Sequence, residues 1–424
     1  MLEIIMILYT LYAMMEIYIA IMQIGYIAQE KKKEAVLMSP ERYQVAAEYA
    51  IKKGRIGLVS TVMDYILFVW WITVGFAWLS ATLHTDNSVL GAVVFLFGFV
   101  AISFLVGLPM EIYTIFELDK EYGFSKMTPK LYIQDKLKSM LLFLVIGGGL
   151  FALLSWIVIH VEHWWIWGFI LLFGVALLAN VIYPLVIVPM FNKLSPMEEG
   201  KLKEDIEAMM QGVGLKSDGV FVMDAGKRDS RLNAYFGGLG KSKRVVLFDT
   251  LIEKLNHKEL LAVLGHELGH FSHGDIWKNI AMMGVLLFSV FFLFGNLPDE
   301  LFYEMGVERH AGVEIAMMIL LLPLVSFVFT PIMSFLSRHN EYAADAFGSN
   351  LGGKEHLVSA LIKLVDENKS FPKSHPLVVF FHFTHPPVLE RLKELGYDAT
   401  AINEVAQPLP QDGIFTFINE EKRG

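Results

Sequence analysis

Long apolar runs dominate the hydrophobic pattern of this chain and predict several membrane-spanning helices. A spanning helix needs about twenty consecutive residues that are mainly apolar. Seven runs reach this length, at residues 2–27, 56–83, 88–110, 139–160, 164–192, 276–296 and 312–336. The first run contains Glu3 and Glu16 and has neither a basic start nor a small-residue cleavage site, so it predicts a retained helix instead of a signal peptide.

More polar stretches divide the chain into four parts. Residues 1–192 contain the first five spans with their basic loops, and residues 276–336 contain the last two spans. Residues 193–275 and 337–424 mix polar and apolar positions and predict two parts outside the bilayer.

The first of these outer parts predicts a small sheet with a helix before it. We expect a helix over residues 203–213 and a strand over residues 219–224. Residues 231–236 and 244–249 predict a hairpin across the glycine-rich turn 237–240.

A second helix is predicted directly after the hairpin. Asn256 and Glu259 have the spacing of a capping box, in which each side chain caps the other's backbone N–H. The helix is therefore expected to begin near His257 and to end before Gly274.

Composition and charge support a polytopic membrane protein and give its orientation. Hydrophobic residues make up 54% of the 424 residues and charged residues only 19%. Seven Lys and Arg residues lie in 28–55 and five in 111–138, whereas 84–87 and 161–163 have none and 297–311 has only Arg309. Because basic loops stay in the cytoplasm, the N-terminus is predicted to lie on the opposite side of the membrane from the cytoplasm. Residues 193–275 and 337–424, which include the C-terminus, are predicted to lie in the cytoplasm.

The remaining composition excludes several classes of site. The sequence contains no cysteine, which excludes disulfides, thiolate metal ligands and cysteine nucleophiles. The net charge of −9 and the lack of a long basic tract argue against nucleic-acid binding.

The strongest chemical signal is the sequence His-Glu-Leu-Gly-His at residues 266–270 in the second predicted helix. Residues i and i+4 lie on one helix face, so His266 and His270 can bind one metal ion while Glu267 lies beside them. The chain crosses the bilayer twice before Glu341, which brings that carboxylate back to the same side. We therefore predict one zinc ion per chain, with His266, His270 and Glu341 as ligands and Glu267 as the base that takes a proton from zinc-activated water. The alternative is a surface helix with two solvated histidines.

Three further polar positions have two interpretations each. Asp345, one turn after Glu341, is either an acceptor for a ligand imidazole N–H or an exposed carboxylate. His385 is either a hydrogen-bond donor to the oxyanion of the reaction or a helix-entry residue before two prolines. His273 and Asp275 are interpreted as polar residues at a helix end and are placed outside the metal site.

Two acidic residues within the spans also need explanation. Glu16 and Asp64 are costly in hydrocarbon. Two interpretations are open. Either both residues face a polar, water-filled cavity, or Asp64 lies near the membrane surface.

Separated motifs in a fixed order resemble the type I CAAX prenyl proteases, which are integral-membrane zinc endopeptidases of the a-factor-converting kind. These motifs lie at residues 121–126, 233–237, 266–270, 341–347, 385–387 and 390–392. The resemblance implies a mainly α fold in which seven transmembrane helices enclose a water-filled chamber, with a zincin-like α+β catalytic part on the cytoplasmic side. It also implies that Asn233 and Ala234 form the substrate-binding edge strand and that His385 is the transition-state donor.

The resemblance implies cleavage near the C-terminus of prenylated CAAX substrates, but two other functions stay open. One is quality control of membrane proteins by an HtpX-like protease without a need for prenylation, although that type has fewer spans. The other is a transporter or channel with structural zinc, for which the expected inverted repeats are missing. The segment Leu336–Asn340 departs from the family pattern, and Arg338 within it is expected to pair with an acidic neighbour.

Location and partners follow from the same reasoning. We expect a multi-pass protein of a bacterial inner membrane, or of the endoplasmic reticulum if the source is eukaryotic. The expected partners are a peptide or protein substrate and membrane lipid, with no nucleic acid, and the protein is expected to act as a monomer.

Overall fold

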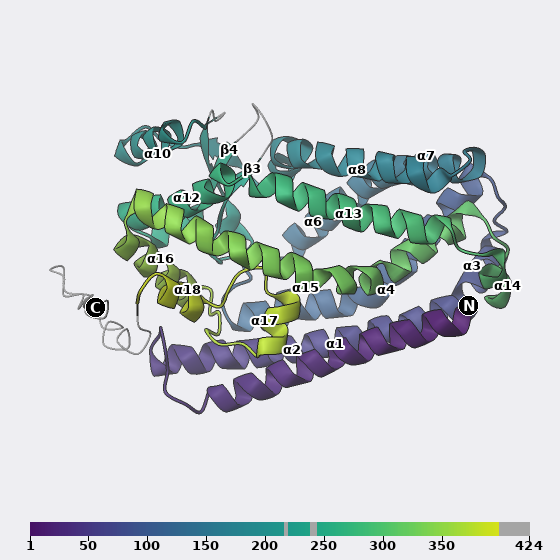
Figure 1. Ribbon diagram of the computed structural model, residues 1–424, viewed down its shortest axis with the longest axis horizontal. Coiled ribbons are helices and arrows are strands. Elements are labelled where there is room, and N and C mark those ends of the chain that lie inside the picture. Colours follow the sequence, from purple (N-terminus) through teal and green to yellow (C-terminus); the bar gives the residue numbers. More distant parts are fainter. Residues whose placement is uncertain (216–218, 238–243, 398–424) are drawn as a thin grey trace, which may run out of the picture.

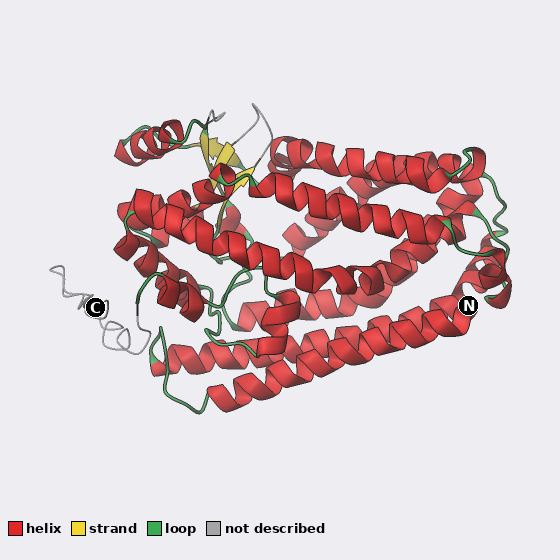
Figure 2. Cartoon of the chain, viewed as in Figure 1, coloured by secondary structure: helices red, strands yellow, loops and turns green. Residues whose placement is uncertain are grey.

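The computed structural model describes residues 1–215, 219–237 and 244–397 and has seven helices that are long and apolar enough to cross a membrane. These are Leu2–Glu30, Pro40–Leu83, Val89–Glu121, Pro129–His160, Trp164–Phe191, Asp275–Gly295 and Ala311–Gly352. The seven predicted spans are confirmed. The helices run roughly side by side along the long axis of the molecule (Figures 1 and 2).

Four of the spans change their helical winding part-way. The second span consists of α2 (Pro40–Trp70), a π-helical turn η1 (Trp71–Gly75) and α3 (Phe76–Leu83). The next three are α4–η2–α5 (Val89–Tyr113, Thr114–Leu118, Asp119–Glu121), α6–η3–α7 (Pro129–Leu142, Phe143–Gly147, Gly148–His160) and α8–η4–α9 (Trp164–Ile182, Tyr183–Ile187, Val188–Phe191). The first, sixth and seventh spans are α1 (Leu2–Glu30), α13 (Asp275–Gly295) and α15 (Ala311–Gly352).

Several helices begin or end beyond the predicted apolar runs. The second and fourth spans begin at Pro40 and Pro129, each after an N-cap residue whose side chain accepts a backbone hydrogen bond. Hydropathy detects only the apolar part of a helix, whereas capping and proline at the first position set where it begins.

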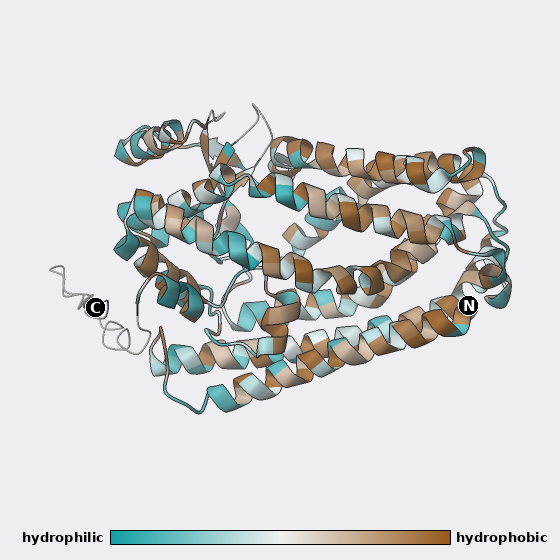
Figure 3. Ribbon diagram, viewed as in Figure 1, coloured by the Kyte–Doolittle hydropathy of each residue, from teal (hydrophilic) through white to brown (hydrophobic). Residues whose placement is uncertain are grey.

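Hydrophobic residues predominate along the long helices, and the sheet and several shorter helices lie at one end of them (Figure 3). Figure 1 shows the sheet, α12 (His257–Ser272), α16 (Lys354–Glu367) and α18 (Val388–Glu394) at this end. At the opposite end the Met1 amino group bonds Glu304 of α14 (Asp299–Glu304) at 3.1 Å.

The sheet has four short strands in the order β1-β2-β4-β3. These strands are β1 (Leu194–Pro196), β2 (Val220–Met223), β3 (Ala234–Gly237) and β4 (Arg244–Phe248). β3 and β4 pair antiparallel, which confirms the predicted hairpin, and β2 pairs parallel with β4. β1 was not predicted, because Leu-Ser-Pro has too little strand pattern. β3 therefore forms an edge of the sheet.

The helices around the sheet also match the sequence. α10 (Lys201–Gly212) corresponds to the predicted helix 203–213, while residues 238–240 of the predicted turn lie outside the described residues. α12 begins at His257 with both hydrogen bonds of the capping box formed, as predicted. The remaining short helices are η5 (Ala225–Lys227), α11 (Asp249–Lys254) and α17 (Pro376–His382).

The two acidic residues of the first and second spans share a cavity. Glu16 and Asp64 both line a space of about 620 Å³ between α1, α2, α4 and α15. Tyr12, Thr61 and Ser103 add polar groups to its wall. This agrees with the cavity interpretation of the two acids; that water fills one large chamber stays a prediction.

Candidate active site

Close packing of α12 on α15 builds the candidate metal site. A Cβ atom on Gly348 of α15 would lie 2.6 Å from the backbone nitrogen of His266, and one on Gly269 of α12 would lie 2.8 Å from the Cα of Ala344. Only glycine fits at such distances, because real Cβ atoms do not approach backbone so closely. The two helices therefore lie near enough for short side chains to meet between them.

His266, His270 and Glu341 meet at this contact. Each offers one ligand atom, and the three atoms lie within 4.8 Å of one another. His266 Nε2 lies 3.5 Å from Glu341 Oε2, and His270 Nε2 lies 3.2 Å from Glu341 Oε1. His266 and Glu341 are buried, whereas His270 is partly exposed.

These distances fit a tetrahedral ion. Zinc binds imidazole nitrogen and carboxylate oxygen at about 2.0–2.2 Å, which separates neighbouring ligand atoms by about 3.4 Å in a tetrahedron. Glu341 Oε2 is buried and has no hydrogen-bond partner among the described residues. A buried carboxylate oxygen without a hydrogen bond, beside two imidazoles, belongs to a donor set that a divalent cation satisfies.

Two carboxylates orient the imidazoles. Asp345 Oδ1 lies 2.8 Å from His266 Nδ1, and Asp275 Oδ2 lies 2.9 Å from His270 Nδ1. With each Nδ1 bound in this way, both Nε2 atoms are free to face Glu341. Burial alone would lower the pKa of His270, but its hydrogen bonds to the carboxylates of Glu341 and Asp275 raise it to about 9.

The sequence interpretation missed Asp275. It was interpreted as a polar residue at a helix end, and it does begin α13, but it is also buried and contacts His270. Gly274 has a φ of +67°, so the chain turns sharply between α12 and α13 and brings Asp275 back to His270. Gly274, between His270 and Asp275 in the sequence, was the available signal for this sharp turn.

Arg391 was also missed as part of the site. It is buried and donates to both carboxylate oxygens of Asp345, at 2.7 and 2.6 Å. Its Nη1 lies 3.6 Å from Glu341 Oε2. The guanidinium thus compensates the negative charge beside the imidazoles, and Asp345 is not the exposed carboxylate of the alternative interpretation.

Glu267 lies on α12 between the two imidazoles and lines a cavity of about 580 Å³. Burial raises the pKa of its carboxyl group. A raised pKa brings a carboxylate nearer to the pH at which it can both accept and return a proton.

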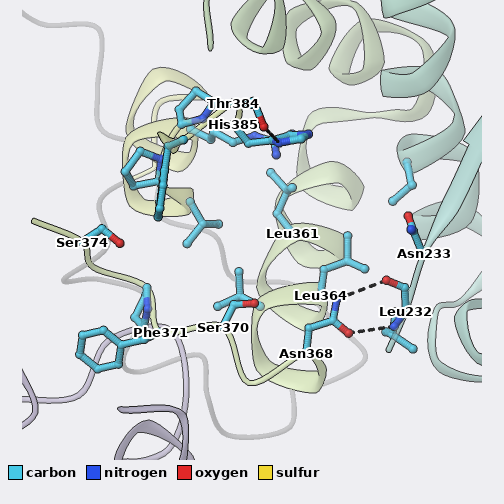
Figure 4. A pocket seen from close by; sticks show the side chains of 18 of the residues that line it. Leu232, Asn233, Leu361, Leu364, Asn368, Ser370, Phe371, Ser374, Thr384 and His385 are labelled. Carbon is cyan, nitrogen blue, oxygen red and sulfur yellow. Dashed lines mark hydrogen bonds between the residues drawn. The ribbon is translucent and has the colours of Figure 1, made fainter. Parts of the chain in front are cut away.

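The same cavity contains the residues assigned to substrate binding. Asn233 and Ala234 line it from the start of β3, and His385 lines it from the loop after α17 (Figure 4). His385 Nε2 lies 3.2 Å from Glu341 Oε1, beside the candidate ligands. The cavity therefore brings together the predicted base, the predicted edge strand and the predicted donor.

On the outer edge of β3, the backbone N–H of Ala234 already donates a hydrogen bond to a side chain. The Asn233 carbonyl accepts from Phe248 of β4 at 3.2 Å, so by strand alternation Ala234 directs its backbone groups away from β4. The Ala234 N–H donates to Asn233 Oδ1 at 2.9 Å. A peptide that pairs with this edge would replace that side-chain acceptor with its own carbonyl.

The loop that carries His385 is held by Arg338, although not as expected. Arg338 was predicted to pair with an acidic residue. Instead, its Nη1 donates to the carbonyls of Val379 and Phe383 at 2.6 and 2.8 Å. These bonds satisfy the carbonyls at the end of α17 and connect α15 to the segment before His385.

Comparisons with known proteins bear on this arrangement. Residues 196–399 match the model of peptidase family M48, and residues 23–193 match that of the CAAX prenyl protease N-terminal region with five membrane helices. CAAX prenyl protease 1 of Saccharomyces cerevisiae is 36% identical over 390 residues, which cover 84% of this chain and 86% of the yeast protein. The chain belongs to the CAAX prenyl protease 1 family.

Other members of this family agree in sequence and fold. The CAAX prenyl protease 1 homolog of rice is 32% identical, and the alignment covers 85% of this chain and 88% of the rice protein. The crystal structure of S. mikatae Ste24p matches with a TM-score of 0.85 and 31% identity, and covers 93% of this chain and 99% of that one. The predicted family, the mainly α fold with seven spans and a small sheet, and the membrane metalloprotease activity are confirmed, and a transporter or channel is excluded.

Proposed function

We propose that this metalloprotease uses zinc to cleave peptide bonds near the C-terminus of prenylated CAAX substrates. One observation carries the proposal: Glu267, the outer edge of β3 and His385 all line one cavity beside the three candidate ligands. The names of the related proteases supply the substrate class.

Zinc fits the donor set best among common metals. Two imidazoles and one carboxylate are the ligands of known catalytic zinc sites, whereas magnesium and calcium prefer oxygen alone. When bound, zinc would supply a Lewis acid that activates water and polarises the scissile carbonyl. Asp345 and Asp275 keep each ligand imidazole in the tautomer that presents Nε2.

The remaining residues divide the proton transfers and the binding of the peptide. The substrate lies extended along β3 and bonds to the backbone of Ala234, with Asn233 beside it. Glu267 accepts a proton from the attacking water and passes it to the leaving amine. His385 donates a hydrogen bond to the oxygen that becomes negative in the transition state.

The basic loops lie at the catalytic end of the helices, which favours a cytoplasmic active site with the N-terminus outside. The absence of cysteine favours a bacterial inner membrane over the endoplasmic reticulum. We propose that the protein acts there as a monomer, in contact with membrane lipid.

Cleavage of matched peptides tests this function. The purified protein should cleave a farnesylated CAAX peptide, lose activity with a chelator and recover it with zinc. Glu267→Gln should keep the metal and lose cleavage by at least about 10²-fold. Cleavage that persists in this variant would overturn the role of Glu267.

An unprenylated peptide of the same sequence separates the two remaining functions. A preference for the farnesylated peptide supports the CAAX assignment. Equal kcat/KM values for both peptides would favour a quality-control protease with the same chemistry.

A further inference from the structure

A second cavity lies beside the outer edge of β3. It has a volume of about 630 Å³ and is separate from the cavity that contains Glu267. Its wall includes Ala179, Tyr183, Pro184 and Val188 of the fifth span, together with Tyr235 of β3. This volume lies within the range of about 300–1,000 Å³ that is usual for small-ligand sites.

The start of β3 adjoins both cavities. Asn233 lines both of them, Ala234 lines only the catalytic cavity, and Tyr235 lines only the second cavity. Ala234 packs with the core below α12, whereas Tyr235 packs with Val188 on the other side of the sheet. Ala234 and Tyr235 therefore point to opposite faces of the strand, and each of them lines a different cavity.

An extended peptide on this edge would reach both cavities. Successive side chains of a strand point to opposite faces, and a peptide paired with β3 follows the same alternation. If one residue next to the scissile bond faces α12, its neighbour faces the second cavity. A long side chain at that neighbouring position would lie against the fifth span.

The wall of the second cavity suits an apolar chain. Nine of the thirteen described residues that line it are aliphatic or aromatic, and its polar side chains include Asn180, Asn192 and Asn233. Among the described residues, no Lys, Arg, Asp or Glu lines it. Pro184 lies within the π-helical turn η4, where the fifth span changes its winding. At this turn the span approaches β3 so closely that a Cβ on Gly237 would lie 3.2 Å from Pro184 Cβ.

We propose that this cavity binds the isoprenyl chain of the substrate. The inference rests on the proposed function, because it assumes a prenylated peptide on β3. A substrate-borne chain fits better than a membrane lipid, since the cavity adjoins the peptide edge through Asn233 and its described lining includes no Lys or Arg to pair with a phosphate headgroup.

Photo-crosslinking tests the location directly. Full-length Glu267→Gln protein, which retains substrate, is mixed with a CAAX peptide that carries a diazirine on its farnesyl chain. After irradiation, mass spectrometry should find label on residues 179–188 or 233–237. The proposal would be overturned if the label were confined to the cavity around Glu16 and Asp64. It would also be overturned if an unmodified farnesyl peptide did not displace the label.

A kinetic comparison tests whether the cavity recognises the chain. Ala179→Phe narrows the second cavity, and Ile319→Phe places a phenylalanine in the wall of the cavity around Glu16 as a control for location. The ratio of kcat/KM for farnesylated over unprenylated peptide should fall about tenfold in Ala179→Phe and stay at the wild-type value in Ile319→Phe.

The outcomes separate this inference from the proposed function. A wild-type ratio near one would overturn prenyl recognition and this inference together. A high wild-type ratio that Ala179→Phe leaves unchanged, with label elsewhere, would overturn only the cavity assignment. If Ala179→Phe does not fold, the crosslinking result decides alone, because it uses an unaltered cavity.

Discussion

Arg391 and Asp345 form a buried, two-point ion pair next to the candidate metal ligands, with N–O distances of 2.7 and 2.6 Å. Asp345 in turn lies 2.8 Å from His266 Nδ1. The arginine thus acts on His266 through Asp345 and also lies directly beside Glu341, with Nη1 3.6 Å from Oε2. Its removal would leave a buried carboxylate without its main counter-charge.

Removal of this arginine should weaken metal binding. Arg391→Ala should lower zinc affinity about 10–100-fold, because Asp345 no longer fixes the His266 ring. Competition with a chromophoric chelator measures the affinity. Arg42→Ala, which removes an exposed pair with Asp366, is the matched control and should leave the affinity unchanged. Unchanged affinity in Arg391→Ala would contradict the orienting role.

Loss of His385 should affect turnover more than metal binding. His385→Ala should lower kcat about 10²–10³-fold, with KM and zinc content near wild type, because its hydrogen bond acts mainly in the transition state. His339→Ala, at an exposed histidine of α15, serves as the control. If zinc content falls in parallel with kcat, His385 supports the metal site instead.

Periodicity, charge and one motif were sufficient to predict most of the fold. Apolar runs gave the seven spans, and the spacing in residues 257–270 gave a helix with two histidines on one face. Local signals of this type are strong because each depends only on neighbouring residues and on the period of the helix.

Contacts between distant segments were harder to predict. Arg391 lies 125 residues from His266, and no local pattern connects them. Asp275 is near His270 in sequence, but its role depends on the left-handed conformation of Gly274. The small-residue contact of α12 with α15, which sets the site, also appears only once both helices are in place.

A second ion pair connects α5, at the end of the third span, to the segment just before β3. Arg231 lies two residues before Asn233. Its Nη2 lies 2.9 Å from Asp119 Oδ1 and 2.7 Å from the Tyr49 hydroxyl. Its guanidinium also lies 4.1 Å from the centre of the Phe124 ring. These contacts fix the entry to β3 to the end of the third span.

Loss of Arg231 should therefore weaken peptide binding. Arg231→Ala should raise KM about tenfold, equivalent to about 1.4 kcal/mol, with zinc content unchanged. Steady-state kinetics on the farnesylated peptide measures this effect. Lys52→Ala removes an exposed pair between α2 and Glu121 of α5 and should leave KM unaltered. A wild-type KM in Arg231→Ala would mean that β3 is held by the sheet alone.

His310 should make stability depend on pH at the end of the molecule away from the metal site. It is buried beside Phe95, and its Nδ1 has no hydrogen-bond partner among the described residues. Burial lowers its pKa from 6.5 to about 4. Between these values the unfolded chain binds a proton that the folded protein does not, so the free energy of unfolding falls as pH decreases from about 6.5 to 4.

The loss should reach roughly 3 kcal/mol over this range, because each pKa unit corresponds to about 1.4 kcal/mol. Thermal unfolding in detergent at pH 7 and pH 4.5 measures it. His310→Gln should reduce the difference between the two melting temperatures, whereas His163→Asn, at an exposed histidine, should not. Equal pH dependence in both variants would show that His310 is protonated in the folded state, since a histidine that keeps its charge on folding contributes no such slope.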